Sequence, residues 1–426
     1  MALTLTKQAA ILTLGNVLTR GLGFLLHLLL ARWMGAEALG VMEMANSVGM
    51  LALTPVTAGI PSAMSRITAK RDADQQPAVL HAGQRIVLRM SLWLIPALLL
   101  LSPTLAWLLG DMRTQPAIML NAPDILLLGL CSVYCGYCYG QENTLLPAAA
   151  EVVEQTVRFV LSVSLVWCLR RASVGTLAAL PGLAEAVAAV AVVIILRRAL
   201  PVAARTLPRD RPLEKQLFAL STPTTVSRLC LTGMRTLNAV LLPVCLRRSG
   251  LSAAAATAQF GLLSGMAMPL MMIPGVVTSA LCMITTPAIS RSEGSPRALR
   301  CTMRRLMLPA LLIGLLSAAG LYFTADFICI HLYNTPALAP LVRFMCPMTL
   351  IFAVHQVQMG MITGLGLQKR SLTGTILSIA VTLVLTALLA PVPGLRLFGA
   401  AMASMLGHLT AMLWDALLLR RVRCQA

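Results

Sequence analysis

The sequence predicts an all-α integral membrane protein with about twelve transmembrane helices, arranged as two six-helix bundles. The first observation is composition: 58% of the 426 residues are hydrophobic, only 12% are charged, and the mean hydropathy is +0.82. Soluble domains are about 45–50% apolar and about 25% charged. The second observation is that apolar runs of membrane-spanning length recur along the whole chain. Together these observations exclude a soluble globular protein.

The twelve spans follow from the length of each apolar run, because a bilayer core about 30 Å thick needs roughly 20 residues per helix. The predicted spans are about 8–32, 41–65, 86–110, 123–141, 147–169, 175–196, 216–246, 254–287, 304–324, 338–364, 371–391 and 396–419. The first run is too long for the apolar region of a signal peptide, so we expect it to be retained. The seventh and eighth runs contain internal prolines, and we expect kinks there.

The charged residues predict the orientation of these spans. The chain has 34 Lys and Arg residues against 15 Asp and Glu residues, a formal net charge of +19. In a soluble protein this excess would suggest nucleic acid, a partner that the apolar composition makes us reject. With the N-terminus in the cytoplasm, the inner segments contain 22 of the 34 cations. The positive-inside rule then places both termini in the cytoplasm, next to anionic membrane lipids.

The longest polar connection, residues 197–215, separates six predicted spans from six. We therefore predict an N-terminal bundle over residues 1–205 and a C-terminal bundle over residues 206–426. Two halves with equal span number and the same orientation are typical of secondary transporters, whose substrate sites lie between the halves near the bilayer midplane.

Several arginines interrupt the apolar spans. Arg20, Arg158 and Arg228 each lie about eleven or twelve residues into a predicted span, or roughly 18 Å at the helical rise. Arg235 follows Arg228 by two helical turns and shares its face. A charge at the bilayer centre costs about 2.5–3.5 kcal/mol, so each of these residues needs a reason. Because arginine binds phosphate in a bidentate manner, the four residues predict a site for a phosphate-bearing anion.

The fifth span contains a polar stripe with helical spacing, formed by Glu151, Glu154, Gln155 and Arg158. Glu154 and Arg158 are four residues apart and can pair. We predict that this stripe lines a water-filled cavity and takes part in coupling. Acids at the depth of the arginines do not balance them, so we expect a net basic cavity. Three further polar residues of the spans are predicted to hydrogen-bond the substrate: Asn16, Asn238 and Gln259.

The sequence does not favour an enzyme or a metal site. No lysine follows a glycine, so the Gly-Lys-Ser/Thr loop of many nucleotide-driven proteins is missing. The only close Asp pair, Asp72 and Asp74, lies in a basic loop. Cys131, Cys135 and Cys138 share an apolar run and are interpreted as buried thiols. We expect no catalytic residue, no metal and no cofactor, and leave a coupling ion, H⁺ or Na⁺, open.

Four stretches of this chain resemble a known family. The run LTRGLGFLLHLLLARWMGAEALGVMEMANSV with TAGIPSAMSRITAKR resembles the opening of the polysaccharide-export flippases, and in particular the stage V sporulation protein B group. YGQENTLLPAAAEVVEQTVRFVL, AQFGLLSGMAMPLMMIPGVVTSALCMITTPAIS and GMITGLGLQKR are similar to later motifs of these proteins. This group belongs to the multidrug/oligosaccharidyl-lipid/polysaccharide (MOP) exporter superfamily, with lipid II flippases and multidrug-and-toxin-extrusion (MATE) antiporters. Lipid II flippases usually carry an arginine and an acid where this chain has Leu26 and His27.

The resemblance implies a fold and a function. The fold would be two six-helix bundles around a central cavity that opens to alternate sides of the bacterial cytoplasmic membrane. The substrates would be polyprenyl-diphosphate-linked saccharides, such as precursors of peptidoglycan or spore cortex, and cell-wall synthesis enzymes would be partners. Arg20 matches the basic position of the first span, and Glu154, Gln155 and Arg158 match the motif of the fifth.

An ion-coupled exporter of drugs or toxins has the same fold and remains the alternative. Cavity charge distinguishes the two functions, since an exporter of organic cations needs a surplus of carboxylates. Glu151, Glu154 and Glu185 in the cavity, with the arginines turned to lipid, would favour the exporter.

Overall fold

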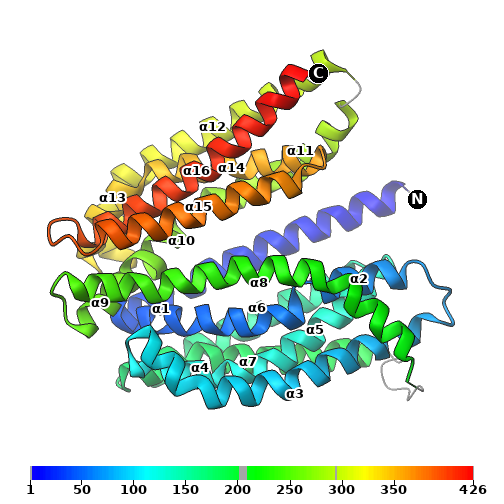
Figure 1. The fold of residues 1–426 in the computed structure, drawn as a ribbon, viewed down its shortest axis with the longest axis horizontal. Helices are drawn as coiled ribbons and strands as arrows, with labels where there is room; N and C mark the ends of the chain where they lie inside the picture. The colour runs from blue at the N-terminus through cyan, green and yellow to red at the C-terminus, as the bar shows by residue number, and fades with distance from the viewer. Residues whose placement is uncertain (1, 201–208, 293–294, 426) are drawn as a thin grey trace. The chain divides into compact units, whose positions relative to one another are not determined.

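The computed structural model describes the backbone of residues 2–200, 209–292 and 295–425, with side chains described from Gly15 onward apart from 16, 276, 280, 283, 284, 296 and 423–425. All regular structure in this part of the chain is helical, which confirms the all-α prediction. The α-helices are α1 (Ala2–Thr57), α2 (Ile60–Thr68), α3 (Gln76–Leu109), α4 (Gln115–Leu120), α5 (Ala122–Gly140), α6 (Leu145–Cys168), α7 (Val174–Ala199), α8 (Arg211–Arg248), α9 (Ala253–Phe260), α10 (Met268–Met271), α11 (Pro274–Ser292), α12 (Pro296–Phe327), α13 (Ala339–Met345), α14 (Pro347–Gly364), α15 (Gln368–Leu389) and α16 (Arg396–Gln425) (Figure 1).

The chain forms two compact units. Unit 1 consists of Met1–Met34 and Val41–Thr236, and unit 2 of Gly35–Gly40 and Leu237–Ala426. Helices α1 and α8 therefore contribute residues to both units. The division into bundles over residues 1–205 and 206–426 stays a prediction.

The predicted spans are helical, but the helices are continuous or broken at other places than predicted. Among the described residues, eight helical stretches are long and apolar enough to cross a membrane, or nine if the α13–α14 pair, bent by 52°, is one span. One of the eight, Val17–Thr68, covers most of the first predicted span and all of the second. The predicted eighth span is divided into α9, a π-helix over Gly261–Ala267, α10 and α11, which begins at Pro274. In contrast, α8 is one continuous helix despite its prolines.

The fifth predicted span, α6, is 24 residues long but is not among the eight apolar stretches. Its three ionisable residues, Glu151, Glu154 and Arg158, lie so close together that every 18-residue stretch of the helix contains all of them. The polar stripe of the sequence is thus the reason that this helix lacks the character of a simple lipid-facing span.

A single residue, Gly35, separates the first two predicted spans. Its φ of 77° and ψ of 172° interrupt the helical geometry of α1. Side chains with a Cβ disfavour this backbone region, and glycine adopts it freely. The connection expected over residues 33–40 is therefore a one-residue break, with helix on both sides.

In unit 1, close approach of α2 and α5 depends on glycines of the GYCYG segment of α5. A Cβ at Gly136 would lie 2.6 Å from the carbonyl oxygen of Pro61, and a Cβ at Gly140 would lie 2.5 Å from the Cβ of Thr68. Gly136 and Gly140 have the small-xxx-small spacing that lets membrane helices approach closely.

Unit 2 repeats this arrangement between α11 and α14. The GMITG segment of α14 has glycines at the same spacing, and a Cβ at Gly364 would lie 2.7 Å from the carbonyl oxygen of Thr286. The Thr286 hydroxyl donates a hydrogen bond to the carbonyl oxygen of Gly360 at 3.2 Å. The recurrence of one helix contact in both units supports an internal repeat.

These contacts predict opposite effects for two glycine-to-alanine substitutions. Gly136→Ala places a methyl group against the backbone of Pro61 and should destabilise the protein by about 1–3 kcal/mol, as overpacking does. Gly320→Ala in α12 has no atom within 4 Å of the new Cβ and should leave stability unchanged or raise it by up to about 1 kcal/mol. Thermal unfolding of the detergent-solubilised chain measures both. Equal melting temperatures for the two variants would contradict the assigned packing.

Candidate functional site

A cavity of about 310 Å³ lies within unit 1, among α1, α6 and α7. Its volume is at the lower end of the range for small-molecule sites, about 300–1,000 Å³. Its polar lining comes from three places: both halves of α1, the stripe of α6 and the middle of α7. These side chains are Thr19, Arg20, His27, Glu43, Asn46, Glu151, Gln155, Arg158 and Glu185.

The break at Gly35 makes this cavity possible. Arg20 and Glu43 both line it, although they are 23 positions apart in α1. A straight helix would separate them by about 35 Å. The two halves of α1 must therefore fold back on each other, so that each contributes one wall.

The two arginines of the cavity differ in their surroundings. Arg158 forms an ion pair with Glu185 of α7, with 3.2 Å between Nη2 and Oε2. Both side chains are only about a quarter exposed, at 27% and 25%. Arg20 is exposed, and no acidic residue in the described part of unit 1 forms an ion pair with it. The cavity thus contains one neutralised cation and one that is open to an incoming anion.

The pairing of Arg158 corrects one expectation. The sequence suggested Glu154, one helical turn away, as its partner, but the ion pair is to Glu185. Glu154 does not line the cavity. In a bundle, a neighbouring helix competes with the i, i+4 position, and here α7 presents its carboxylate to Arg158.

The cavity is also not the basic site that we expected. Glu43, Glu151 and Glu185 line it together with Arg20 and Arg158. The expectation of a cation surplus is therefore wrong for this cavity. The fold-back of α1 at Gly35 is the reason, because it brings Glu43 to the cavity that Arg20 and Arg158 line.

A second, smaller cavity of about 200 Å³ adjoins the first within unit 1. Three residues line both cavities: Asn46, Arg158 and Glu185. Asp124 of α5 lines only the smaller one; its side chain is buried, and its Oδ1 has no hydrogen-bond partner. The Arg158–Glu185 pair therefore forms part of the boundary between two polar spaces.

The structure brings together four of the ten predicted site residues: Arg20, Glu151, Gln155 and Arg158. Arg228 and Arg235 belong to unit 1 but are exposed on α8 and line neither cavity. Asn238 and Gln259 belong to unit 2, where each has a buried amide oxygen without a hydrogen-bond partner. The side chain of Asn16 lies outside the described residues.

Sequence reasoning missed Glu43 and Asn46 as cavity residues, and placed Glu185 in the cavity only under the exporter alternative. For Glu185 a signal was present, because it lies eleven residues after the start of α7, the same depth count that singled out Arg158. Glu43 offered no such signal, since only the sharp break at Gly35 gives it its place.

This arrangement suits a polar, anionic guest. Arg20 can form charge-assisted hydrogen bonds to phosphate oxygens, and Arg158 can do so once it leaves Glu185. The carboxylates and the amides of Gln155 and Asn46 can accept or donate hydrogen bonds to hydroxyl and amide groups. No group of three or more His, Cys, Asp or Glu residues within the described parts of the chain is arranged to hold a metal ion.

Comparison with known proteins agrees with this architecture. The family described as Polysaccharide biosynthesis protein matches residues 5–293. Stage V sporulation protein B of Bacillus subtilis strain 168 is 26% identical over 435 residues, covering 98% of this chain and 84% of the relative.

Two solved structures show the same fold. The lipid II flippase MurJ in an inward closed conformation superposes with a TM-score of 0.77 at 11% identity, over 96% of this chain and 87% of that one. An inward-facing multidrug resistance MATE family transporter of the MOP superfamily gives a TM-score of 0.73 at 16% identity, over 98% and 99% of the two chains. Together with the family match, this fold confirms the predicted architecture: the chain belongs to the polysaccharide biosynthesis protein family and has the helical membrane fold of MOP transporters.

Proposed function

We propose that this protein is a flippase that moves polyprenyl-diphosphate-linked saccharides, such as a precursor of peptidoglycan or spore cortex, across the bacterial cytoplasmic membrane by alternating access. The observation that carries the proposal is the presence of Arg20 and Arg158 in one polar cavity of an otherwise apolar bundle. Family membership supports a role in polysaccharide assembly. The protein would act as a transporter with both termini in the cytoplasm, without a cofactor, and alongside enzymes of cell-wall synthesis.

Arg20 has the first role in this proposal. It is exposed at the cavity and lacks an acidic partner in the described part of unit 1, so it can meet the diphosphate before any internal contact breaks. Gln155 and Glu151 on the facing helix would then hydrogen-bond the saccharide. Arg228, Arg235, Asn238, Gln259 and Asn16 keep their predicted roles in binding as part of the proposal.

The Arg158–Glu185 pair has the second role. Removing one member of a buried ion pair leaves an uncompensated charge and costs about 3–5 kcal/mol. A diphosphate can release Arg158 from Glu185 because it supplies the replacement negative charge. A coupling ion, H⁺ or Na⁺, would then balance the freed negative charge and connect transport to an ion gradient.

An ion-coupled exporter of organic cations remains the second candidate, because one observation favours it. Three carboxylates and only two arginines line the cavity. The flippase explains the arginines better, because Arg20 and Arg158 lie in the cavity with the acids and would repel an organic cation.

Substitution of Arg20 tests the flippase directly. Arg20→Gln should slow translocation of a fluorescent lipid-linked precursor in proteoliposomes about 10- to 100-fold, because a hydrogen bond to a charged group contributes about 1.5–3 kcal/mol. Arg171→Gln is the matched control, since Arg171 is exposed and lies outside the cavity. Undiminished flipping by Arg20→Gln would refute the proposed role. Intact flipping together with faster organic-cation efflux would instead support the exporter.

The ion pair makes a separate prediction about binding. Glu185→Gln removes the competitor of the diphosphate and should tighten precursor binding by roughly tenfold, whereas Arg158→Gln should weaken it by a similar factor. Titration of the fluorescent precursor in detergent measures both constants, and Glu142→Gln controls for loss of an exposed acid. If both substitutions weaken binding equally, the pair is only structural.

A further inference from the structure

A second site of different character lies within unit 2. A cavity of about 700 Å³ opens where α12 begins and α16 ends, with α14 along its side. Three arginines line it: Arg300 and Arg304 of α12 and Arg420 of α16. No acidic residue is among its lining residues, and none of the three arginines forms an ion pair with a described residue of unit 2.

The acid nearest to Arg420 along α16, Asp415, is already engaged. Asp415 lies five positions before Arg420 in α16. In the structure Asp415 contacts His355 of α14, with 3.2 Å between Nε2 and Oδ2, and Asp415 is almost fully buried. The positive charge of Arg420 is therefore left to face the cavity.

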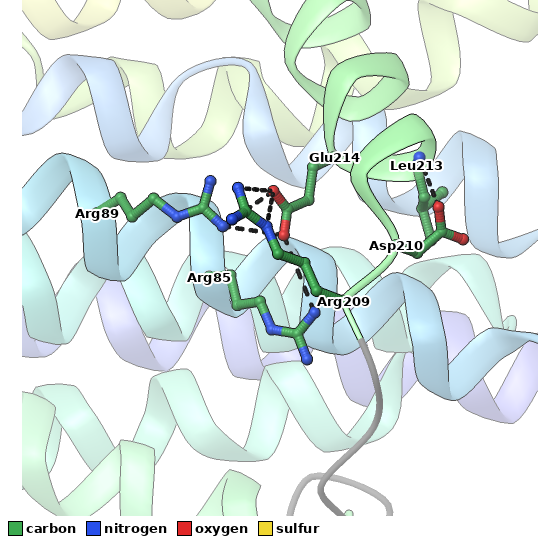
Figure 2. Close-up of polar contacts among 6 residues, drawn as sticks. All are labelled: Arg85, Arg89, Arg209, Asp210, Leu213 and Glu214. Carbon is green, nitrogen blue, oxygen red and sulfur yellow. Dashed lines mark hydrogen bonds and ion pairs between the residues drawn. The ribbon is translucent and has the colours of Figure 1, made fainter.

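Unit 1 shows what a protein counterion for such arginines looks like. Helix α3 has arginines at the same four-residue spacing, Arg85 and Arg89, and the buried carboxylate of Glu214 lies against them (Figure 2). The distances from Glu214 to Arg89 and Arg209 are 2.9 and 3.3 Å. The arginines of α12 have the spacing but not the carboxylate.

The floor of the unit 2 cavity is apolar. It is formed by Met303, Met307, Met361 and Leu419, and three of these belong to the buried core of the unit. Methionine side chains adapt readily to an irregular apolar guest. The ligand that this cavity fits therefore has an anionic group and an apolar part.

One buried polar group adds to this requirement. Gln358 of α14 lines the cavity and is only 4% exposed, and its Oε1 has no hydrogen-bond partner. A buried amide without a partner is costly unless a bound molecule satisfies it. Because this oxygen accepts hydrogen bonds, the bound molecule must supply a donor, such as a hydroxyl of a lipid head group.

We propose that this cavity binds the phosphate of an anionic membrane lipid, with Arg300, Arg304 and Arg420 around the phosphate and an acyl or prenyl chain on the methionine floor. Basic pockets between membrane helices commonly bind lipid head groups. The apolar floor distinguishes a lipid from free phosphate or an acidic peptide. The site is separate from the cavity of unit 1 and does not depend on the flippase proposal.

Native mass spectrometry of the full chain tests the site. Phosphatidylglycerol should form a discrete adduct, and Arg300→Gln combined with Arg304→Gln should weaken its binding at least tenfold. Arg305→Gln removes the same charge from the next position of α12, which does not line the cavity, and should change binding less than twofold. Replacing Arg300 and Arg304 by lysine keeps the charge and should retain most of the binding. Equal binding by the glutamine double variant and the Arg305 variant would overturn the proposal.

Cysteine protection tests the same site in the unaltered protein. Cys301 is exposed and lines the cavity, whereas Cys168 and Cys230 are exposed elsewhere. Phosphatidylglycerol should slow maleimide modification of Cys301 at least fivefold and leave Cys168 and Cys230 unaffected. Equal protection by phosphatidylcholine or by inorganic phosphate would contradict a site for a lipid phosphate.

Competition between two lipids identifies which phosphate-bearing lipid the cavity binds. If undecaprenyl phosphate displaces phosphatidylglycerol at equal concentration, the site accepts a polyprenyl carrier. If it does not, the ligand is a phospholipid. If an acidic peptide binds the cavity and neither lipid does, the assignment is refuted.

Discussion

The ion pair between Arg158 and Glu185 is the interaction on which the candidate site depends. A lone guanidinium within an apolar bundle would cost at least about 2.5–3.5 kcal/mol, and Glu185 offsets part of that cost with its carboxylate 3.2 Å from Arg158. In the proposed function, the same pairing would make the site selective. A ligand would have to offer negative charge in place of Glu185 before Arg158 could leave that carboxylate.

Backbone geometry sets where these charges meet. The break at Gly35 folds α1 back on itself and brings Glu43 to the cavity that Arg20 lines. The glycines of α5 and α14 let neighbouring helices approach to backbone contact, which gives the two units a common pattern of packing. A few glycines therefore determine where the charged side chains lie.

Much of this could be predicted from the sequence. Apolar run length and composition give the membrane fold, because the bilayer imposes one helix length on every span. Helical spacing identifies the stripe from Glu151 to Arg158, and depth identifies Arg20. Pairing across helices could not be predicted in this way: the choice of Glu185 over Glu154 depends on how α7 packs against α6. The location of Glu43 depends on a single backbone angle at Gly35.

The central claim is that a diphosphate replaces Glu185 as the partner of Arg158. An experimental structure with a bound polyprenyl-diphosphate saccharide tests this most directly. Phosphate density is expected within hydrogen-bonding distance of both Arg20 and Arg158, with the Arg158–Glu185 contact opened. Density for the diphosphate elsewhere, with that ion pair intact, would contradict it.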